Sequence, residues 1–225
     1  MPRPRADSRK RPLGTTASAP RGSGCSFGLL LPPLAVLIIG CLLAAFVGKY
    51  STVKPQPVYA QGNISPIFSK EIQYWSHDLL RWNADFGLDP NLAATVMQIE
   101  SCGDPFAESS AGAMGLFQVM PFHFYASENP YQPDTNAQRG LDYLARSLQR
   151  AGGDVASALA GYNGGISLIG RGEWSWPAET KRYVYFGEGI YADARAGLTV
   201  SARLDEWYEK FGAGLCAQAS DRLGL

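Results

Sequence analysis

Residues 98–121, QIESCGDPFAESSAGAMGLFQVMP, lead from the end of an apolar run into a loop of small residues. The run ends on a single carboxylate, Glu100, and the loop that follows is rich in glycine, alanine and serine. Gln118 stands near the end of the loop, between Phe117 and Val119. An isolated acid before so flexible a stretch is the first feature of this sequence that needs a physical reason.

Glu100 falls on the apolar face of a predicted helix. Asp89 and Pro90 are typical of an N-cap and a first helical position, so the helix begins there. At about 100° per residue, with Leu92 at zero, Val96 lies at about 40° and Glu100 at about 80°. A carboxyl that faces the core at a helix C-terminus favours its protonated form. Glu100 therefore has the properties of a general acid, with a solvated or salt-bridged glutamate as the alternative.

The helical pattern extends through most of the chain. Apolar residues recur at intervals of three and four, and alternating strand patterns are almost absent. Asp154 is a candidate N-cap for a helix that begins at Val155. The sequence therefore predicts an all-α globular domain from about residue 66 onward, with helices in residues 69–82, 86–101, 136–153, 155–165, 179–194 and 198–214.

The N-terminal part of the chain differs in charge and hydropathy from the rest. Residues 1–50 carry a net charge of +6 and the remainder a net charge of −6. Residues 27–47 are an apolar run that follows the basic residues, which predicts a single transmembrane helix with the N-terminus in the cytoplasm. Pro32 and Pro33 shorten the run, so a cleaved signal peptide is one alternative. Lipidation at Cys41 and a buried core helix are the others.

The cysteines and histidines indicate whether the protein has a disulfide or a metal site. Cys102 and Cys216 both fall in the part expected outside the cytoplasm, where disulfides persist, so we consider a Cys102–Cys216 bridge, with two buried free thiols as the alternative. No pair of cysteines has zinc-ligand spacing, and the histidines are only His77 and His123. We therefore expect no metal and no cofactor. The acidic main region also argues against a nucleic acid partner.

Four ordered motifs resemble the lytic transglycosylases of the lysozyme superfamily. They are the Glu-Ser pair that begins at Glu100, then SSAGAMGLFQVMP (109–121), ALAGYNGG (158–165) and ETKRYV (179–184). The resemblance covers roughly residues 70–192. Phe117 and Gly161 depart from the usual Met and Ala of the family, at positions that look like packing sites.

The resemblance implies a fold, a substrate and a reaction. It implies a lysozyme-like helical catalytic domain that cleaves the β-1,4 bond between N-acetylmuramic acid and N-acetylglucosamine in peptidoglycan without water. Glu100 acts as acid and then as base, while the C6 hydroxyl of the muramoyl residue closes a 1,6-anhydro ring. A single carboxylate is then sufficient because the nucleophile belongs to the substrate. The substrate-binding residues implied are Ser101, Ser109, Gly115, Leu116, Gln118, Tyr162, Asn163 and Tyr183.

The expected organisation follows from these assignments. Residues 1–22 form a disordered basic cytoplasmic tail, 23–48 a transmembrane anchor or uncleaved signal, and 49–66 a linker. Residues 67–192 form the lysozyme-like transglycosylase domain and 193–225 a C-terminal helical extension. The catalytic domain is then extracytoplasmic and bound to the cell membrane, or secreted if the signal is cleaved. Its partners are peptidoglycan glycan strands and the membrane.

Two other functions remain open from the sequence. One is a hydrolytic muramidase or chitinase on the same fold, and the other is a non-catalytic cell-wall-binding component of an envelope complex. Asp104 and Glu108 are the nearest alternatives for a second acid, and we expect them to be structural and solvated, respectively. We expect His123 to be a surface or packing residue, with a position in the groove as the alternative. Trp174 and Trp176 form either a sugar platform or a buried clamp.

Overall fold

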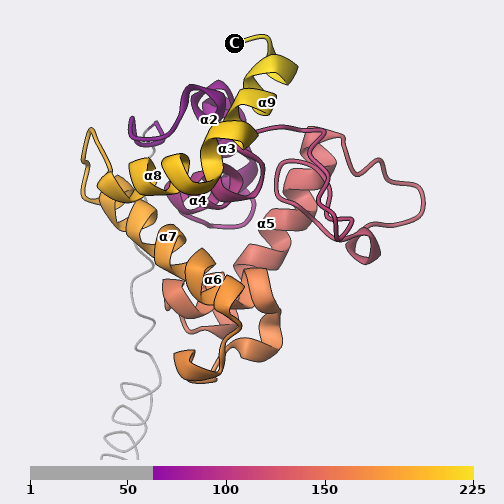
Figure 1. The fold of residues 1–225 in the computed structure, drawn as a ribbon. Coiled ribbons are helices and arrows are strands. Elements are labelled where there is room, and N and C mark those ends of the chain that lie inside the picture. Colours follow the sequence, from indigo (N-terminus) through magenta and orange to yellow (C-terminus); the bar gives the residue numbers. More distant parts are fainter. Residues whose placement is uncertain (1–62) are drawn as a thin grey trace, which may run out of the picture. The chain divides into compact units, whose positions relative to one another are not determined.

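The computed structural model describes residues 63–225 and is all-helical in that range (Figure 1). This confirms the predicted all-α class. The expected transmembrane segment, basic tail and most of the linker lie outside the described residues. Between residues 63 and 225, no helix combines the length and the apolar character needed to span a membrane. The elements are α2 (Lys70–Tyr74), α3 (Ser76–Ala84), α4 (Pro90–Ser101), η1 (Pro121–His123), α5 (Pro133–Arg150), α6 (Val155–Gly164), η2 (Ile166–Leu168), η3 (Glu173–Ser175), α7 (Ala178–Arg195), α8 (Ala202–Trp207), the π-helical η4 (Tyr208–Gly212) and α9 (Ala213–Leu223).

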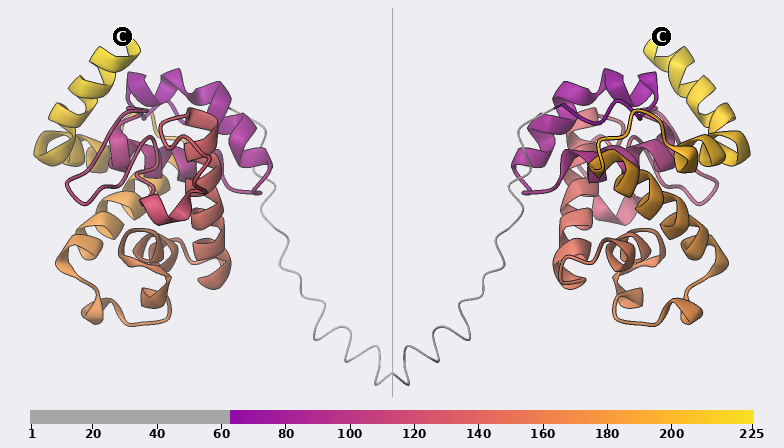
Figure 2. Two further views of the ribbon diagram at one scale, coloured as in Figure 1. Left: turned by 90° about the vertical axis from the view of Figure 1, so that its right-hand side faces the viewer. Right: turned by 90° about the vertical axis from the view of Figure 1, so that its left-hand side faces the viewer.

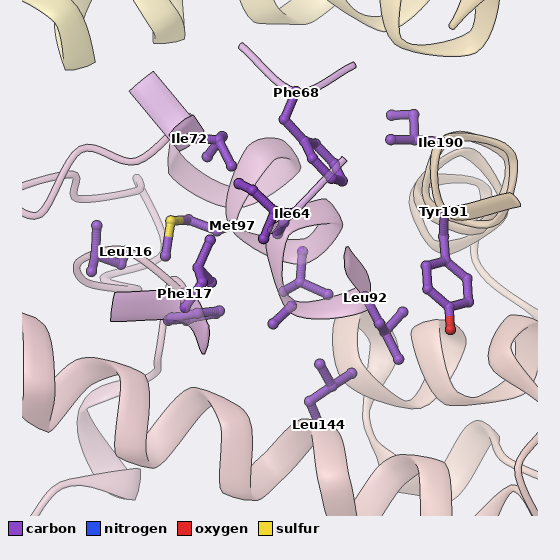
Figure 3. Close-up of a cluster of buried hydrophobic side chains, with 14 of the residues drawn as sticks. Ile64, Phe68, Ile72, Leu92, Met97, Leu116, Phe117, Leu144, Ile190 and Tyr191 are labelled. Carbon is purple, nitrogen blue, oxygen red and sulfur yellow. The ribbon is translucent and has the colours of Figure 1, made fainter. Parts of the chain in front are cut away.

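Helix α4 is the central element of the core. It begins as predicted, because the Asp89 side chain accepts a hydrogen bond from the Asn91 N–H and Pro90 occupies the first turn. Every residue of 92–98 is buried, and α4 contacts α2, α3, α7 and α9. Figure 3 shows Leu92 and Met97 among other buried apolar side chains. Each such side chain contributes about 1.5 to 3 kcal/mol by leaving water, so α4 is held firmly in place.

Helices α5, α6 and α7 pack in sequence, α5 on α6 and α6 on α7. The predicted cap of α6 is confirmed, since the Asp154 carboxylate accepts from the Ser157 N–H at 2.8 Å. Helix α5 also approaches the loop after α4 closely at Gly140. A Cβ atom at this position would lie 2.4 Å from the Cβ of Phe117, so the contact requires glycine. This approach places α5 against the loop that contains Gln118.

The C-terminal segment packs on the same core as the rest. Leu204, Trp207, Cys216 and Ala219 belong to the buried cluster that includes Ile64. Helix α9 lies beside α2 although they are at opposite ends of the described residues (Figures 1 and 2). Residues 193–225, expected as a C-terminal helical extension, therefore pack on the core of the helical domain.

Candidate active site

Glu100 lies in the last turn of α4, where the helix leaves the buried core. Residues 92–98 are buried, whereas Glu100 itself retains partial solvent access. The pKa of Glu100 is raised to about 8, mainly because the carboxyl is surrounded by protein atoms. The hydroxyl of Tyr183 lowers this pKa, and the negative charge of Glu179 raises it further. The carboxyl is therefore protonated in most molecules near neutral pH, and Glu100 keeps some exposure to solvent.

Two tyrosines from different helices lie close to Glu100. Burial is the main cause that raises the pKa of both Tyr162 and Tyr183 well above the usual value, and the charge of Glu100 raises both further. Both hydroxyls therefore stay protonated and act as donors. Tyr162 donates to the carbonyl oxygen of Phe117 at 2.8 Å. The buried Tyr183 hydroxyl makes no hydrogen bond of regular geometry within the described part of the chain, which leaves it available to the Glu100 carboxyl.

The loop after Glu100 is shaped by internal hydrogen bonds. The backbones of Met114 and Val119 pair in both directions, at 3.1 and 3.0 Å. Gln118 adopts a left-handed φ of 45°, which non-glycine residues seldom do. Its side-chain amide donates to the carbonyl oxygens of Ala107 at 3.2 Å and Gly115 at 3.0 Å. The left-handed conformation and these bonds hold the Gln118 side chain at the edge of the loop.

A groove of about 240 Å³ runs between this loop and helices α5 and α6. Ring contacts connect Phe122, His123, Tyr143 and Tyr162, with successive centroid distances of 4.5, 5.0 and 5.7 Å. Tyr162 belongs to this wall and also interacts with Glu100, so the groove lies beside the acid. The residues that line it are Gln118, Val119, Met120, Phe122, His123, Gly140, Tyr143, Tyr162, Asn163 and Gly165.

The structure brings together some of the site residues expected from sequence. Glu100, Tyr162 and Tyr183 form one cluster, and Gln118 and Asn163 line the adjoining groove with Tyr162. The Thr180 hydroxyl, in the first turn of α7, donates to Asn163 Oδ1 at 2.8 Å. Helix α7 thus fixes the orientation of one groove residue and carries Tyr183.

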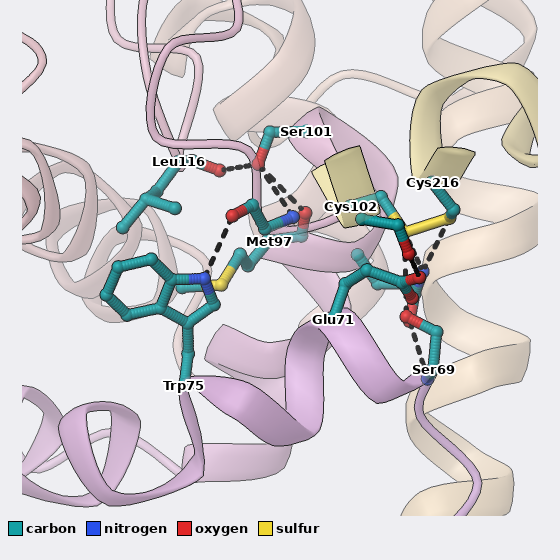
Figure 4. Close-up of a disulfide and its surroundings, with 11 residues drawn as sticks. Ser69, Glu71, Trp75, Met97, Ser101, Cys102, Leu116 and Cys216 are labelled. Carbon is teal, nitrogen blue, oxygen red and sulfur yellow. Dashed lines mark hydrogen bonds between the residues drawn. A yellow bond between two sulfur atoms is a disulfide. The ribbon is translucent and has the colours of Figure 1, made fainter. Parts of the chain in front are cut away.

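The other expected site residues lie at the end of α4 and in the loop that follows it. Ser101 is fully buried, and its hydroxyl donates to the Leu116 carbonyl at 2.7 Å and accepts from the Gly103 N–H at 3.1 Å (Figure 4). Gly115 and Leu116 are also buried. Ser109 accepts from the Ala113 N–H at 3.0 Å and so closes the loop. These contacts show that the four residues shape the backbone around the site, and their contacts with substrate stay a prediction.

Three residues around the site were not among the site residues expected from the sequence. His123 lines the groove, and burial together with the charge of Arg146 lowers its pKa. The Tyr143 hydroxyl accepts from the Ile166 N–H at 3.3 Å, and its ring joins the aromatic wall. Glu179 acts on Glu100 through its charge. The ETKRYV motif (179–184) was the sequence signal for Glu179. A position in the groove was the alternative considered for His123, and no sequence pattern marked Tyr143.

The two tryptophans that the sequence paired have different environments. Trp174 is 86% exposed on η3, whereas Trp176 packs partly buried against the core. A buried clamp therefore describes Trp176 alone.

Cys102 and Cys216 form a disulfide that joins the end of α4 to α9, with their Cα atoms 5.0 Å apart (Figure 4). This bridge is one of the two arrangements expected from the sequence, the other being two buried free thiols. Glu71 lies near both sulfur atoms, the only such group of metal-type ligands found within residues 63–225. Because the sulfurs are bonded to each other, neither offers a thiolate to a metal.

Removal of the Tyr183 hydroxyl is expected to change the acidity of Glu100. In Tyr183→Phe, the hydroxyl that lowers the Glu100 pKa is lost, so the alkaline limb of the pH–rate profile should move to higher pH. Turnover should fall by about tenfold, because the carboxyl loses a partner that orients it. Tyr185→Phe, which alters an exposed tyrosine of the same helix, is the control. An unchanged limb in Tyr183→Phe would contradict this role.

Comparison with known proteins supports the class that the fold and site define. Residues 79–182 match the family model of the Transglycosylase SLT domain. Residues 79–182 are therefore similar to this family, which confirms the resemblance to lytic transglycosylases. The match includes the Glu100 helix, the loop, the groove and Tyr162, and it ends just before Tyr183.

Two curated relatives agree with the match. The chain is 38% identical over 117 residues to a transglycosylase of Enterobacteria phage PRD1, which is 51% of this chain and 42% of that protein. It is 22% identical over 125 residues to membrane-bound lytic murein transglycosylase E of Buchnera aphidicola subsp. Acyrthosiphon pisum (strain APS), 50% of this chain and 57% of that protein. The chain thus spans about half the length of the curated relatives that it matches.

Proposed function

We propose that this protein is a lytic transglycosylase that cleaves the β-1,4 bond between N-acetylmuramic acid and N-acetylglucosamine in peptidoglycan. The observation that carries the proposal is the protonated Glu100 beside a groove of hydrogen-bonding and aromatic side chains. A carboxylic acid with a raised pKa can donate a proton to a leaving glycosidic oxygen at neutral pH. The transglycosylase match supports the substrate class.

The proposed reaction uses Glu100 twice. Its carboxyl protonates the glycosidic oxygen as the bond to C1 breaks. The resulting carboxylate then takes the proton of the C6 hydroxyl of the same muramoyl residue while that oxygen bonds to C1. The product carries a 1,6-anhydro ring, and Glu100 returns to its protonated state. No water enters the balance, so the second carboxylate of hydrolytic glycosidases has no role.

The surrounding side chains have proposed roles in binding and orientation. Tyr183 holds the Glu100 carboxyl in place and stabilises its anionic form between the two steps. Gln118 and Asn163 hydrogen-bond the amide and hydroxyl groups of the glycan from the two sides of the groove. Tyr162 belongs to the aromatic wall, against which a sugar ring can stack.

Hydrolysis on the same fold is the second candidate, favoured by one observation. Glu179 lies near enough to Glu100 to raise its pKa and is exposed in the first turn of α7. By contrast, Asp104 is buried and accepts from the Gln218 amide, and Glu108 accepts from the Tyr131 hydroxyl. Glu179 is therefore the acid that a water-activating mechanism requires. Mass analysis of sacculus digests decides, because the anhydro product is lighter than the hydrolysed product by one water.

Activity and stability are both expected to depend on the Glu100 proton. The active form is protonated, so kcat/KM should fall as pH rises through about 8.

Stability should also depend on this proton. The folded-state pKa of Glu100 lies above its ordinary value of 4.5, so between pH 4.5 and about 8 the folded protein binds more protons than the unfolded chain. The free energy of unfolding therefore declines as pH rises through this range. The slope is at most about 1.4 kcal/mol per pH unit. Denaturation of the wild type and Glu100→Gln at several pH values measures it, and equal slopes would refute the assignment.

The envelope location is proposed on the sequence and on one relative. Residues 23–48, the predicted anchor or uncleaved signal, lie outside the described range, and one relative is named a membrane-bound enzyme. We propose that the domain acts on glycan strands outside the cytoplasm and is held at the membrane by this segment.

A further inference from the structure

The turn that follows Glu100 has an unusual backbone. Cys102 caps α4 with a left-handed φ of 51°, and Gly103 follows with a φ of 83°. Non-glycine residues rarely adopt the left-handed conformation unless surrounding contacts impose it. Because Glu100 lies two residues before Cys102, whatever holds this turn also sets where the carboxyl points.

Helix α9 holds the turn from one side through covalent and polar contacts. The Cys102–Cys216 disulfide ties it to the helix cap, and the Gln218 amide donates to Asp104 Oδ2 at 2.6 Å. The Ser220 hydroxyl donates to Glu71 Oε1 of α2 at 2.5 Å. The side chains of Cys102, Cys216, Asp104 and Glu71 are buried, whereas Gln218 is exposed, so the disulfide is shielded from water and the two hydrogen bonds are partly shielded. Figure 4 shows the disulfide with Glu71 beside it.

Helix α2 and the residue that follows it hold the turn from the other side. The Trp75 indole N–H donates to the Gly103 carbonyl at 2.9 Å. A Cβ atom at Gly103 would lie 3.0 Å from the Trp75 ring and 3.1 Å from the Glu71 carbonyl oxygen, so the backbones approach closely there. The turn is thus enclosed between α2 and α9.

Both enclosing segments lie outside the matched domain. The family match covers residues 79–182, whereas α2 ends at Tyr74 and α9 begins at Ala213. The contacts that fix the turn therefore come from parts of this chain that the domain model does not describe, and they meet at the end of the helix that carries Glu100.

We propose that α9 is a brace that positions Glu100 for the reaction, with Cys102, Cys216 and Gln218 as positioning residues. The brace consists of the Cys102–Cys216 disulfide, the Gln218–Asp104 bond and the Ser220–Glu71 bond. This inference rests on the proposed function, because it assigns the brace a role in that reaction. It also makes the enzyme sensitive to dithiol reductants. A dithiol supplies two electrons and two protons, the S–S bond breaks into two thiols, and the reductant closes into its own disulfide.

The test compares full-length wild type, Cys102→Ser/Cys216→Ser and Gln218→Ala, with Asp221→Asn as the control. Asp221 is exposed on the same helix. We expect the double variant to lose about tenfold in kcat on soluble glycan strands with KM within about twofold, because small displacements of a catalytic group are costly. Gln218→Ala should show a smaller loss and Asp221→Asn none. Dithiothreitol should slow the wild type and leave the double variant unchanged, which controls for Cys25 and Cys41.

Hydrogen exchange separates positioning from general loosening. Amide exchange should accelerate at residues 101–104 in the double variant and stay unchanged in α5. Acceleration in all helices alike, or an unaltered kcat, would overturn the brace. If the wild type itself releases no product, the proposed function fails, while the exchange at residues 101–104 still decides whether α9 holds the turn.

Discussion

Glu100→Gln is expected to lower peptidoglycan cleavage by about 10³-fold, because the amide can neither donate a proton to the leaving oxygen nor accept one from the C6 hydroxyl. Binding should survive, since glutamine has the same size as glutamate and the groove residues are unchanged. The measurement is the release of soluble muropeptides from purified sacculi, followed by mass analysis, together with a pull-down of the variant by sacculi.

Two matched substitutions make the Glu100 experiment specific. Glu108→Gln alters an exposed acid of the same loop and should leave turnover nearly unchanged. Glu179→Gln removes the neighbouring charge that raises the Glu100 pKa, so it should move the alkaline limb to lower pH while anhydro products persist. Loss of all activity in Glu179→Gln with hydrolysed products in the wild type would replace the proposal with the hydrolytic one. Cleavage by Glu100→Gln at the wild-type rate would refute both.

Asn136→Ala is expected to destabilise the protein by roughly 3 kcal/mol, because one buried side chain holds three backbone groups of the groove loop. Asn136 Oδ1 accepts from the Phe117 N–H at 2.8 Å. Its amide group donates to the carbonyl oxygens of Met114 at 2.8 Å and Pro130 at 2.9 Å. Asn136 is fully buried, so the Phe117 N–H loses its partner in the alanine variant with little access to water.

Chemical denaturation followed by circular dichroism measures the loss, with Gln138→Ala, an exposed change on the same helix, as the control. Asn136→Asp keeps the acceptor for Phe117 but turns carboxylate oxygen toward two carbonyls, so it should not restore stability. Cleavage should also drop in Asn136→Ala at temperatures where it stays folded, because Gln118 sits on the loop that Asn136 holds. An unfolding midpoint equal to that of Gln138→Ala would contradict the prediction.

The two experiments separate chemistry from architecture. Glu100→Gln changes the reacting group and leaves the loop bonds intact, whereas Asn136→Ala keeps the acid and loosens the loop that contains Gln118. If Glu100→Gln loses cleavage and Asn136→Ala loses stability, the active site is preformed on a rigid scaffold. Under the brace proposal, the cleavage rate also depends on α9, because this helix acts on Glu100 through the turn at Cys102 and not through the groove.

The sequence by itself determined the helical class, the caps of α4 and α6, and the placement of Glu100 on an apolar face near a helix end. These features depend on periodicity and on residues within one turn of each other, so local order along the chain is enough to reveal them. The motif order pointed to the family, and it also marked Tyr162, Asn163 and Tyr183 as a group.

Only the tertiary structure decided which groups meet around the acid. Ser101, expected to bind substrate, is buried and donates to the Leu116 carbonyl oxygen, and His123, expected as a surface or packing residue, lines the groove. Asn136 gave no sequence signal, although it organises the loop. The partnership of Cys102 with Cys216 spans 114 residues of sequence. Such contacts depend on how helices pack, and packing is set by the whole core at once, so no local pattern records them.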